Sequence, residues 1–83
     1  LNTLAGLPKE RGRHAEAAAR LCEALELEPD SPVLHSNLGG ALVGLEQWEA
    51  AERSFAEALA LKRGFGHAHA NRAEMLRRMG RQA

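Results

Sequence analysis

SNLGGALVGLEQWEAAERSFAEALAL, residues 36–61, is the stretch that decides the fold. It reads as two amphipathic helices joined by a short turn at Glu46-Gln47, because apolar residues recur three and four positions apart on both sides of that turn. The same pattern appears one repeat earlier and one repeat later. Residue pairs separated by thirty-four positions are identical ten times: Leu4/Leu38, Gly6/Gly40, Ala17/Ala51, Glu23/Glu57, Ala24/Ala58, Leu25/Leu59, Leu27/Leu61, His35/His69, Asn37/Asn71 and Leu42/Leu76. A fixed period of this size predicts an array of helical repeats.

The repeat predicts an all-α fold of about five helices. Ser31 followed by Pro32 marks a helix start, because the hydroxyl can cap free backbone amides and proline suits the first helical position. Pro8 interrupts the first expected helix, since proline removes a backbone hydrogen bond. Gly12 and Gly80 are expected to mark equivalent turns. The expected helices cover residues 1–11 (short or kinked), 14–27, 32–45, 48–62 and 67–79.

The apolar face of each expected helix indicates the core. In the helix over 48–62, the residues expected to face inward are Trp48, Ala51, Phe55, Ala58 and Leu59. In the last helix, the apolar side chains are Ala73, Met75, Leu76 and Met79.

Length and composition bound the class of protein. Eighty-three residues make one small domain, and its Ala- and Leu-rich composition suits helices better than strands. No run approaches the roughly eighteen apolar residues of a membrane span, so no membrane association is expected. Cys22 is the single cysteine, which excludes an internal disulfide and favours a reducing, cytoplasmic location. Because the chain begins at Leu1 without methionine, we expect it to be part of a longer protein.

Charge is unevenly distributed although the formal net charge is zero. Residues 1–61 carry five basic and ten acidic side chains (−5), whereas residues 62–83 carry six basic and one acidic (+5). The simplest interpretation is a solvated face. The alternatives are docking of an acidic partner and head-to-tail contact between copies of the chain. Nucleic-acid binding is not expected, because no basic stripe is interleaved with aromatic residues.

The spacing of small and large packing residues resembles that of the tetratricopeptide repeat family. In residues 32–65, the residues that carry the resemblance are Leu38, Gly39, Ala51, Phe55 and Ala58. The chain departs from the family pattern at His35 and His69, where the family has an aromatic residue, and at Arg63 and Arg72. The resemblance implies a right-handed α-solenoid of antiparallel helix pairs, forming one domain over residues 1–83. Residues 1–31 would be a partial first repeat, 32–65 a full second repeat, and 66–83 the first helix of a third repeat or a capping helix.

The resemblance also implies that the first helix of each repeat lines a concave groove. Asn37 and Asn71 occupy equivalent sites in successive repeats, and an amide side chain can pair with the backbone of an extended peptide through both a donor and an acceptor. Similar ladders occur in the repeats of O-linked N-acetylglucosamine transferases; the alternative is that asparagine is simply tolerated on an exposed helix. Arg77 and Arg78 form a basic rim that suits an acidic peptide. The candidate site residues are Ser36, Asn37, His67, Asn71, Glu74, Arg77 and Arg78.

Other kinds of site have weaker support. Of the residues in the carboxylate clamp of chaperone-binding members of the family, only Asn37 has a counterpart here. His67 and His69 lie two positions apart on a helix, so their rings point to different faces and no metal site is expected. His35 and His69 are interpreted as partly buried packing residues. No catalytic set and no cofactor-binding motif is present in the sequence.

Three functional hypotheses follow. The first is a non-catalytic protein-interaction module that binds a protein or an extended peptide, acidic ones included, in its groove. The second is a substrate-presenting segment of a larger enzyme, such as a glycosyltransferase-like protein. The third is a self-associating scaffold, in which the exposed last helix contacts another copy to form a homo-oligomer.

Overall fold

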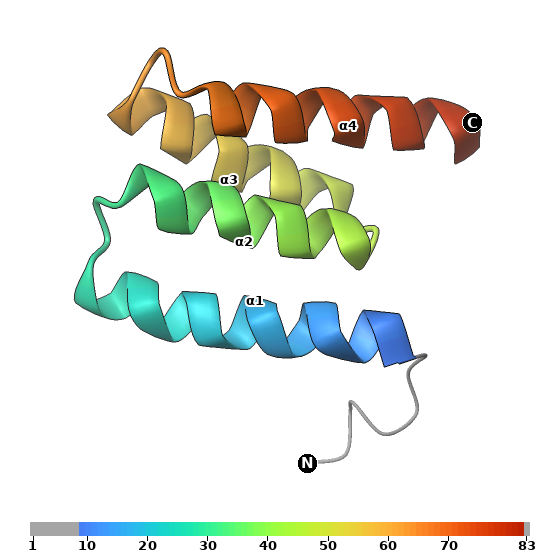
Figure 1. Cartoon of the computed structure of the whole chain (residues 1–83), viewed down its shortest axis with the longest axis horizontal. Coiled ribbons are helices and arrows are strands. Elements are labelled where there is room, and N and C mark those ends of the chain that lie inside the picture. The colour runs from blue at the N-terminus through green and yellow to red at the C-terminus, as the bar shows by residue number, and fades with distance from the viewer. Residues whose placement is uncertain (1–8, 83) are drawn as a thin grey trace.

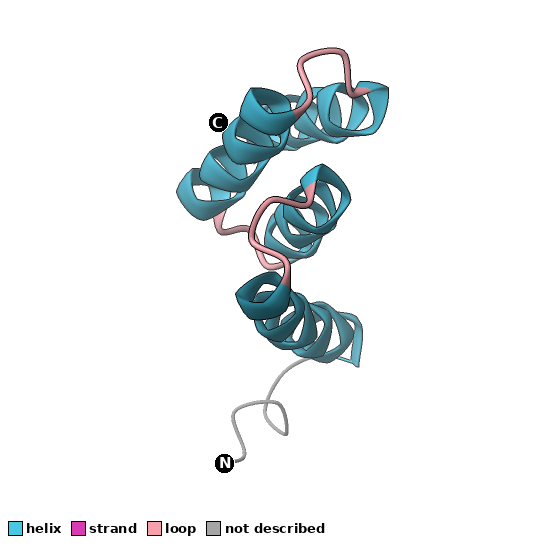
Figure 2. Cartoon of the chain, turned by 90° about the vertical axis from the view of Figure 1, so that its left-hand side faces the viewer, coloured by secondary structure: helices cyan, strands magenta, loops and turns pink. Residues whose placement is uncertain are grey.

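The computed structural model describes residues 9–82, and over these residues the chain is entirely helical. The helices are α1 (Lys9–Leu27), α2 (Pro32–Gly44), α3 (Trp48–Leu61) and α4 (Gly66–Gln82). Figure 1 shows them following one another in chain order, and Figure 2 shows the stack seen nearly along the helix axes. Each helix packs against the next one along the chain, and α2 also contacts α4. The predicted all-α repeat fold is confirmed, with four helices in the described part of the chain where about five were expected.

The two differences in helix boundaries both involve glycine. Gly12 lies inside α1, and Gly80 lies inside α4, so the turns predicted at these residues are wrong. A glycine inside a helix costs only about 1 kcal/mol relative to alanine. A strong helix former next to it can offset this cost, as Arg11 does beside Gly12 and Arg81 beside Gly80. The expected break at Pro8 falls outside the described residues.

The start of α2 is as the sequence predicted. The Ser31 hydroxyl accepts a hydrogen bond from the backbone amide of Leu34 at 3.2 Å, and Pro32 is the first helical residue. At the other end of α2, the amides of Leu45, Glu46 and Gln47 donate to the last carbonyls of the helix. Glu46 takes a left-handed backbone conformation there, with φ of 60°. This tight turn aligns α3 antiparallel to α2.

His35 and His69 perform the same structural task one repeat apart. Nε2 of His35 lies 2.8 Å from the carbonyl oxygen of Pro29, and Nε2 of His69 lies 3.2 Å from that of Arg63. Each imidazole therefore ties a helix to the loop that precedes it. His69 is exposed, so its interpretation as a partly buried packing residue is corrected.

Phe55 is the centre of the core. Its side chain is fully buried and packs with Val43, Ala51 and Met75, which come from α2, α3 and α4. Ala51, Phe55 and Ala58 are buried as expected, whereas Trp48 and Leu59 are only half-buried. The core thus lies where α3 fits between α2 and α4.

Gly39 explains how α2 and α3 approach so closely. A Cβ atom at this residue would lie 2.7 Å from Cδ1 and 2.8 Å from Cζ of Phe55. The phenyl ring therefore occupies the space that a side chain on α2 would need.

The apolar residues of α4 divide into two groups. Met75 and Ala68 are buried against the core, but Leu76 is 52% exposed and Met79 37% exposed. Ala73 is exposed as well. Ala73 and Leu76, two of the apolar side chains expected in the last helix, are therefore not covered, because the described chain has no helix that pairs with α4 as α3 pairs with α2.

Candidate functional site

Three adjoining cavities follow the side of α2 that faces α4, and they share Gly44. Their volumes are about 170, 440 and 270 Å³. Arg78 of α4 also lines all three. We call this continuous feature the α2 groove. The other residues that line its cavities are Arg11, Arg13, His14, Gly40, Val43, Glu46, Trp48, Asn71, Glu74 and Arg81.

His14 of α1 forms one wall of the groove because Gly44 has no side chain. A Cβ atom at Gly44 would lie 2.5 Å from two atoms of the imidazole ring, so the ring rests directly on the α2 backbone. Arg11, one turn earlier on α1, donates from Nη2 to the carbonyl oxygen of Leu45 at 3.0 Å. Its Nη1 lies 3.7 Å from the Glu46 carboxylate. These contacts attach α1 to the end of α2.

Asn71 of α4, which lines the groove, is tied to α2 through the buried hydroxyl of Ser36. Its Oγ lies 3.1 Å from Nδ1 of His67 and accepts a hydrogen bond from the Asn71 amide at 3.4 Å. Ser36 is fully buried, so its hydroxyl is enclosed by these two neighbours. This serine is therefore a polar link between α2 and α4, and its interpretation as a residue that faces a ligand is corrected.

Ion pairs arrange the charged side chains of α4. Glu74 pairs with both Arg77 and Arg78, and the Arg78 Nε atom lies 3.2 Å from its carboxylate. These pairs are at least one-third exposed, so each contributes little to stability. Their effect is to position Arg78 over the groove.

The structure brings together three of the seven predicted site residues as groove lining, namely Asn71, Glu74 and Arg78. His67 is exposed and reaches the groove only through its bond to Ser36. Asn37 and Arg77 are exposed but line none of the three cavities.

Sequence reasoning missed the contribution of α1. Arg11, Arg13 and His14 were not predicted as site residues, because the family resemblance assigned the groove to the first helix of each repeat only. The signal that could have found them is Gly44, whose missing side chain leaves room for a neighbouring helix.

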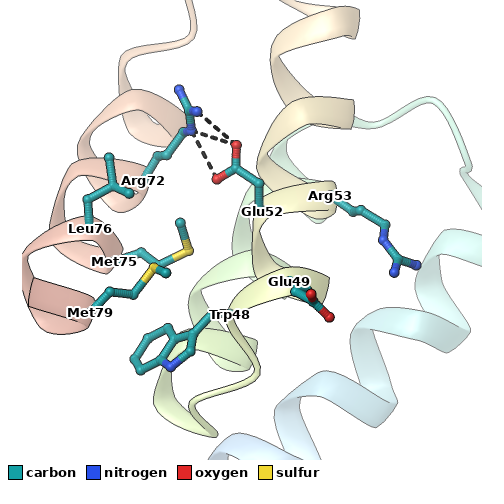
Figure 3. A pocket seen from close by; sticks show the side chains of 8 residues that line it. All are labelled: Trp48, Glu49, Glu52, Arg53, Arg72, Met75, Leu76 and Met79. Atoms are coloured by element: carbon teal, nitrogen blue, oxygen red, sulfur yellow. Dashed lines mark hydrogen bonds and ion pairs between the residues drawn. The ribbon is translucent and has the colours of Figure 1, made fainter. Parts of the chain in front are cut away.

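A second, more apolar cavity of about 470 Å³ lies between α3 and α4 (Figure 3). We call it the α3–α4 groove. Arg72 bridges its upper edge through bonds of 2.8 to 3.1 Å to the Glu52 carboxylate. This hydrogen-bonded partner and its charge raise the pKa of Arg72 above its ordinary value. The residues that line the α3–α4 groove are Trp48, Glu49, Glu52, Arg53, Arg72, Met75, Leu76 and Met79.

Two searches of the described residues bear on other kinds of function. Within residues 9–82, no group of three or more His, Cys, Asp or Glu side chains is arranged to hold a metal ion. Among the helices of this same part of the chain, none combines the length and the apolar character needed to cross a membrane.

Comparison with known proteins gives one match. A family model described as "Tetratricopeptide repeat" matches residues 9–75, which covers most of the chain and all of the core around Phe55. Searches of curated proteins and of solved structures returned no match.

Proposed function

This chain belongs to the tetratricopeptide repeat family, and on that premise we propose that it is a non-catalytic module that binds an extended peptide in the α2 groove. Protein interaction in general is what the family suggests. The observation that supports the finer proposal is that three cavities meet at Gly44, near the end of α2, and share Gly44 and Arg78.

The lining of the groove suits a peptide backbone. Gly40 leaves α2 without a side chain beside Asn71, so a visiting chain can approach the helix closely there, whereas the His14 ring covers the corresponding space at Gly44. The Asn71 amide nitrogen would lie 3.9 Å from a Cβ atom at Gly40. The amide is therefore beside the stretch of α2 that has no side chain. Asn71 donates one N–H to Ser36, so its other N–H and its oxygen can serve a ligand.

We expect replacement of Asn71 by alanine to weaken peptide binding by roughly two- to tenfold, since one lost hydrogen bond contributes about 0.5–1.5 kcal/mol. Asn37 lines none of the three cavities, so Asn37→Ala should have a smaller effect. The melting temperature should change little, because Ser36 keeps its bond to His67. The probe is a peptide selected from a displayed random library against the parent chain, and calorimetry gives the affinity.

The matched control removes an amide outside the groove. Gln47 is exposed and makes no capping hydrogen bond through its side chain, so Gln47→Ala should leave the affinity unchanged. Equal affinities of the parent and the Asn71→Ala variant would reject the amide contact. Failure of the library to yield any peptide that competes at the groove would reject the proposed function.

Self-association is a second candidate function, and the α3–α4 groove favours it. Leu76 and Met79 expose apolar surface on the same side of α4 as the cavity. In the register of the repeat, Leu76 corresponds to Leu42, which packs against the core. A helix from a second copy could therefore pack on α4 as α3 packs on α2.

If this surface joins copies of the chain, the average mass from light scattering should rise with protein concentration, and Leu76→Glu should return the chain to a monomer. Leu27→Glu is the control, because Leu27 is 86% exposed and lies at the end of α1 away from this groove. A parent chain that stays monomeric at every concentration and salt level would exclude self-association.

A further inference from the structure

The largest cavity of the α2 groove is enclosed by cationic side chains from two helices that do not contact each other over the described residues. The cationic residues are Arg11 and Arg13 from α1 and Arg78 from α4, and His14 and Gly44 complete the lining. We call this cavity of about 440 Å³ the basic cavity. Among the side chains that the structure describes, none that lines it carries a carboxylate.

The carboxylates that pair with these arginines neutralise only part of the positive charge around the cavity. Arg11 is paired with Glu46, and Arg78 with Glu74, at the edges of the cavity. Arg13 is exposed and has no ion-pair partner among the described residues. Among the side chains that the structure describes, three guanidinium groups thus pair with two carboxylates, and like charges around one space repel unless an anion joins them.

Hydrogen-bond donors are also in excess. An arginine carries five N–H donors, and Arg78 uses only its Nε atom in the bond to Glu74, while Arg11 uses its terminal nitrogens for Leu45 and Glu46. Backbone amides occupy the carbonyls of Ala41, Leu42 and Val43 near the end of α2. An anion in the basic cavity would therefore meet free N–H donors of the arginines.

We propose that the basic cavity binds an anionic side-chain group, a carboxylate or a phosphoryl group, of the peptide held in the α2 groove. This inference rests on the proposed function. Gly44 and Arg78 belong both to the basic cavity and to the part of the groove that contains Asn71, so one bound chain can reach both. The planar guanidinium matches either anion through paired N–H···O bonds.

The test uses three capped hexapeptides that share a Gly- and Ser-based sequence and differ only in two central residues, which are glutamates, phosphoserines or glutamines. NMR titration of the isotope-labelled chain at low and physiological salt measures their affinities. We expect at least one anionic peptide to bind about tenfold more tightly than the glutamine peptide at low salt, with the advantage shrinking as salt rises. The tighter of the two anionic peptides identifies the source of the anion.

Arg13→Glu should reduce the affinity for the anionic peptides to that for the glutamine peptide, because Arg13 has no described partner whose loss would disturb the fold. Arg53→Glu is the matched control, because this substitution changes the net charge by the same amount on α3, outside the basic cavity. Arg13→Lys should retain most of the higher affinity for the anionic peptides. If Arg13→Glu lowers the melting temperature, Arg13→Gln replaces it as the test variant.

Equal affinities for the charged and neutral peptides, equal effects of Arg13→Glu and Arg53→Glu, or no binding of any of the three peptides would overturn the basic cavity as an anion site. The proposed function is judged separately by the library-selected peptide. Binding of that peptide in the α2 groove without sensitivity to Arg13→Glu would leave the proposed function standing and remove only this inference.

Discussion

Replacing Phe55 with alanine is expected to lower the free energy of unfolding by about 3–5 kcal/mol, the range for removing a buried aromatic ring. Phe55 has no exposed surface and contributes to the one cluster in which Val43 of α2 meets Met75 of α4. Its loss would leave a cavity at the junction of three helices. Because a small domain has only about 5–15 kcal/mol of stability in total, a substantial share of it depends on this ring.

Circular dichroism during thermal and urea unfolding measures this effect. The midpoint temperature should fall by more than about 10 °C, since 1 kcal/mol corresponds to about 4–8 °C in a domain of this size. Leu27→Ala, at a side chain that is 86% exposed, is the control and should change the midpoint little. If Phe55→Ala melted within a few degrees of the parent, Phe55 would not be the centre of the core.

Adjacent glycines on α2 are expected to respond to alanine in opposite directions. A Cβ atom at Gly39 would lie closer than 3.0 Å to three atoms of the Phe55 ring, and that ring is enclosed by the core. At Gly40 the nearest such atom is the Asn71 amide nitrogen at 3.9 Å, an ordinary contact. Gly40→Ala should therefore gain helix propensity of up to about 1 kcal/mol, whereas Gly39→Ala should lose more through overpacking than it gains.

The two variants should differ in the free energy of unfolding by about 2–3 kcal/mol, which combines the propensity gain at one site with the overpacking at the other. Urea unfolding of both variants gives the difference. A double-mutant cycle adds the cause: if the Phe55 ring produces the clash, Gly39→Ala should be less harmful when Phe55 is already leucine. Similar stabilities of the two alanine variants would show that α2 and α3 do not meet as closely as Gly39 indicates.

The sequence predicts the repeat and its core because those properties depend on local spacing. The cap at Ser31 and the buried positions of Ala51 and Phe55 follow from the helical period and the repeat register, and the structure agrees with both. Gly12 and Gly80 were misread as turns, because a glycine has the same low helix propensity wherever it stands, and only the neighbouring sequence and packing decide whether the helix continues.

The candidate site was harder to predict, because it depends on contacts between helices. Ser36 lies on the predicted groove face, yet His67 and Asn71 of the next repeat enclose its hydroxyl. His14 and Arg13 lie outside the helices to which the family resemblance assigns the groove, and the missing side chain of Gly44 lets α1 approach there. Such neighbours are set by tertiary packing, which the pattern of one helix does not contain.

The most direct test of groove binding is an NMR titration of the isotope-labelled chain with the library-selected peptide. We predict that the largest changes in amide chemical shift occur at Gly40, Gly44 and Asn71, which line the α2 groove. Binding in the α2 groove would be contradicted if the changes were concentrated at Leu76 and Met79, in the α3–α4 groove, and the α2 amides did not shift.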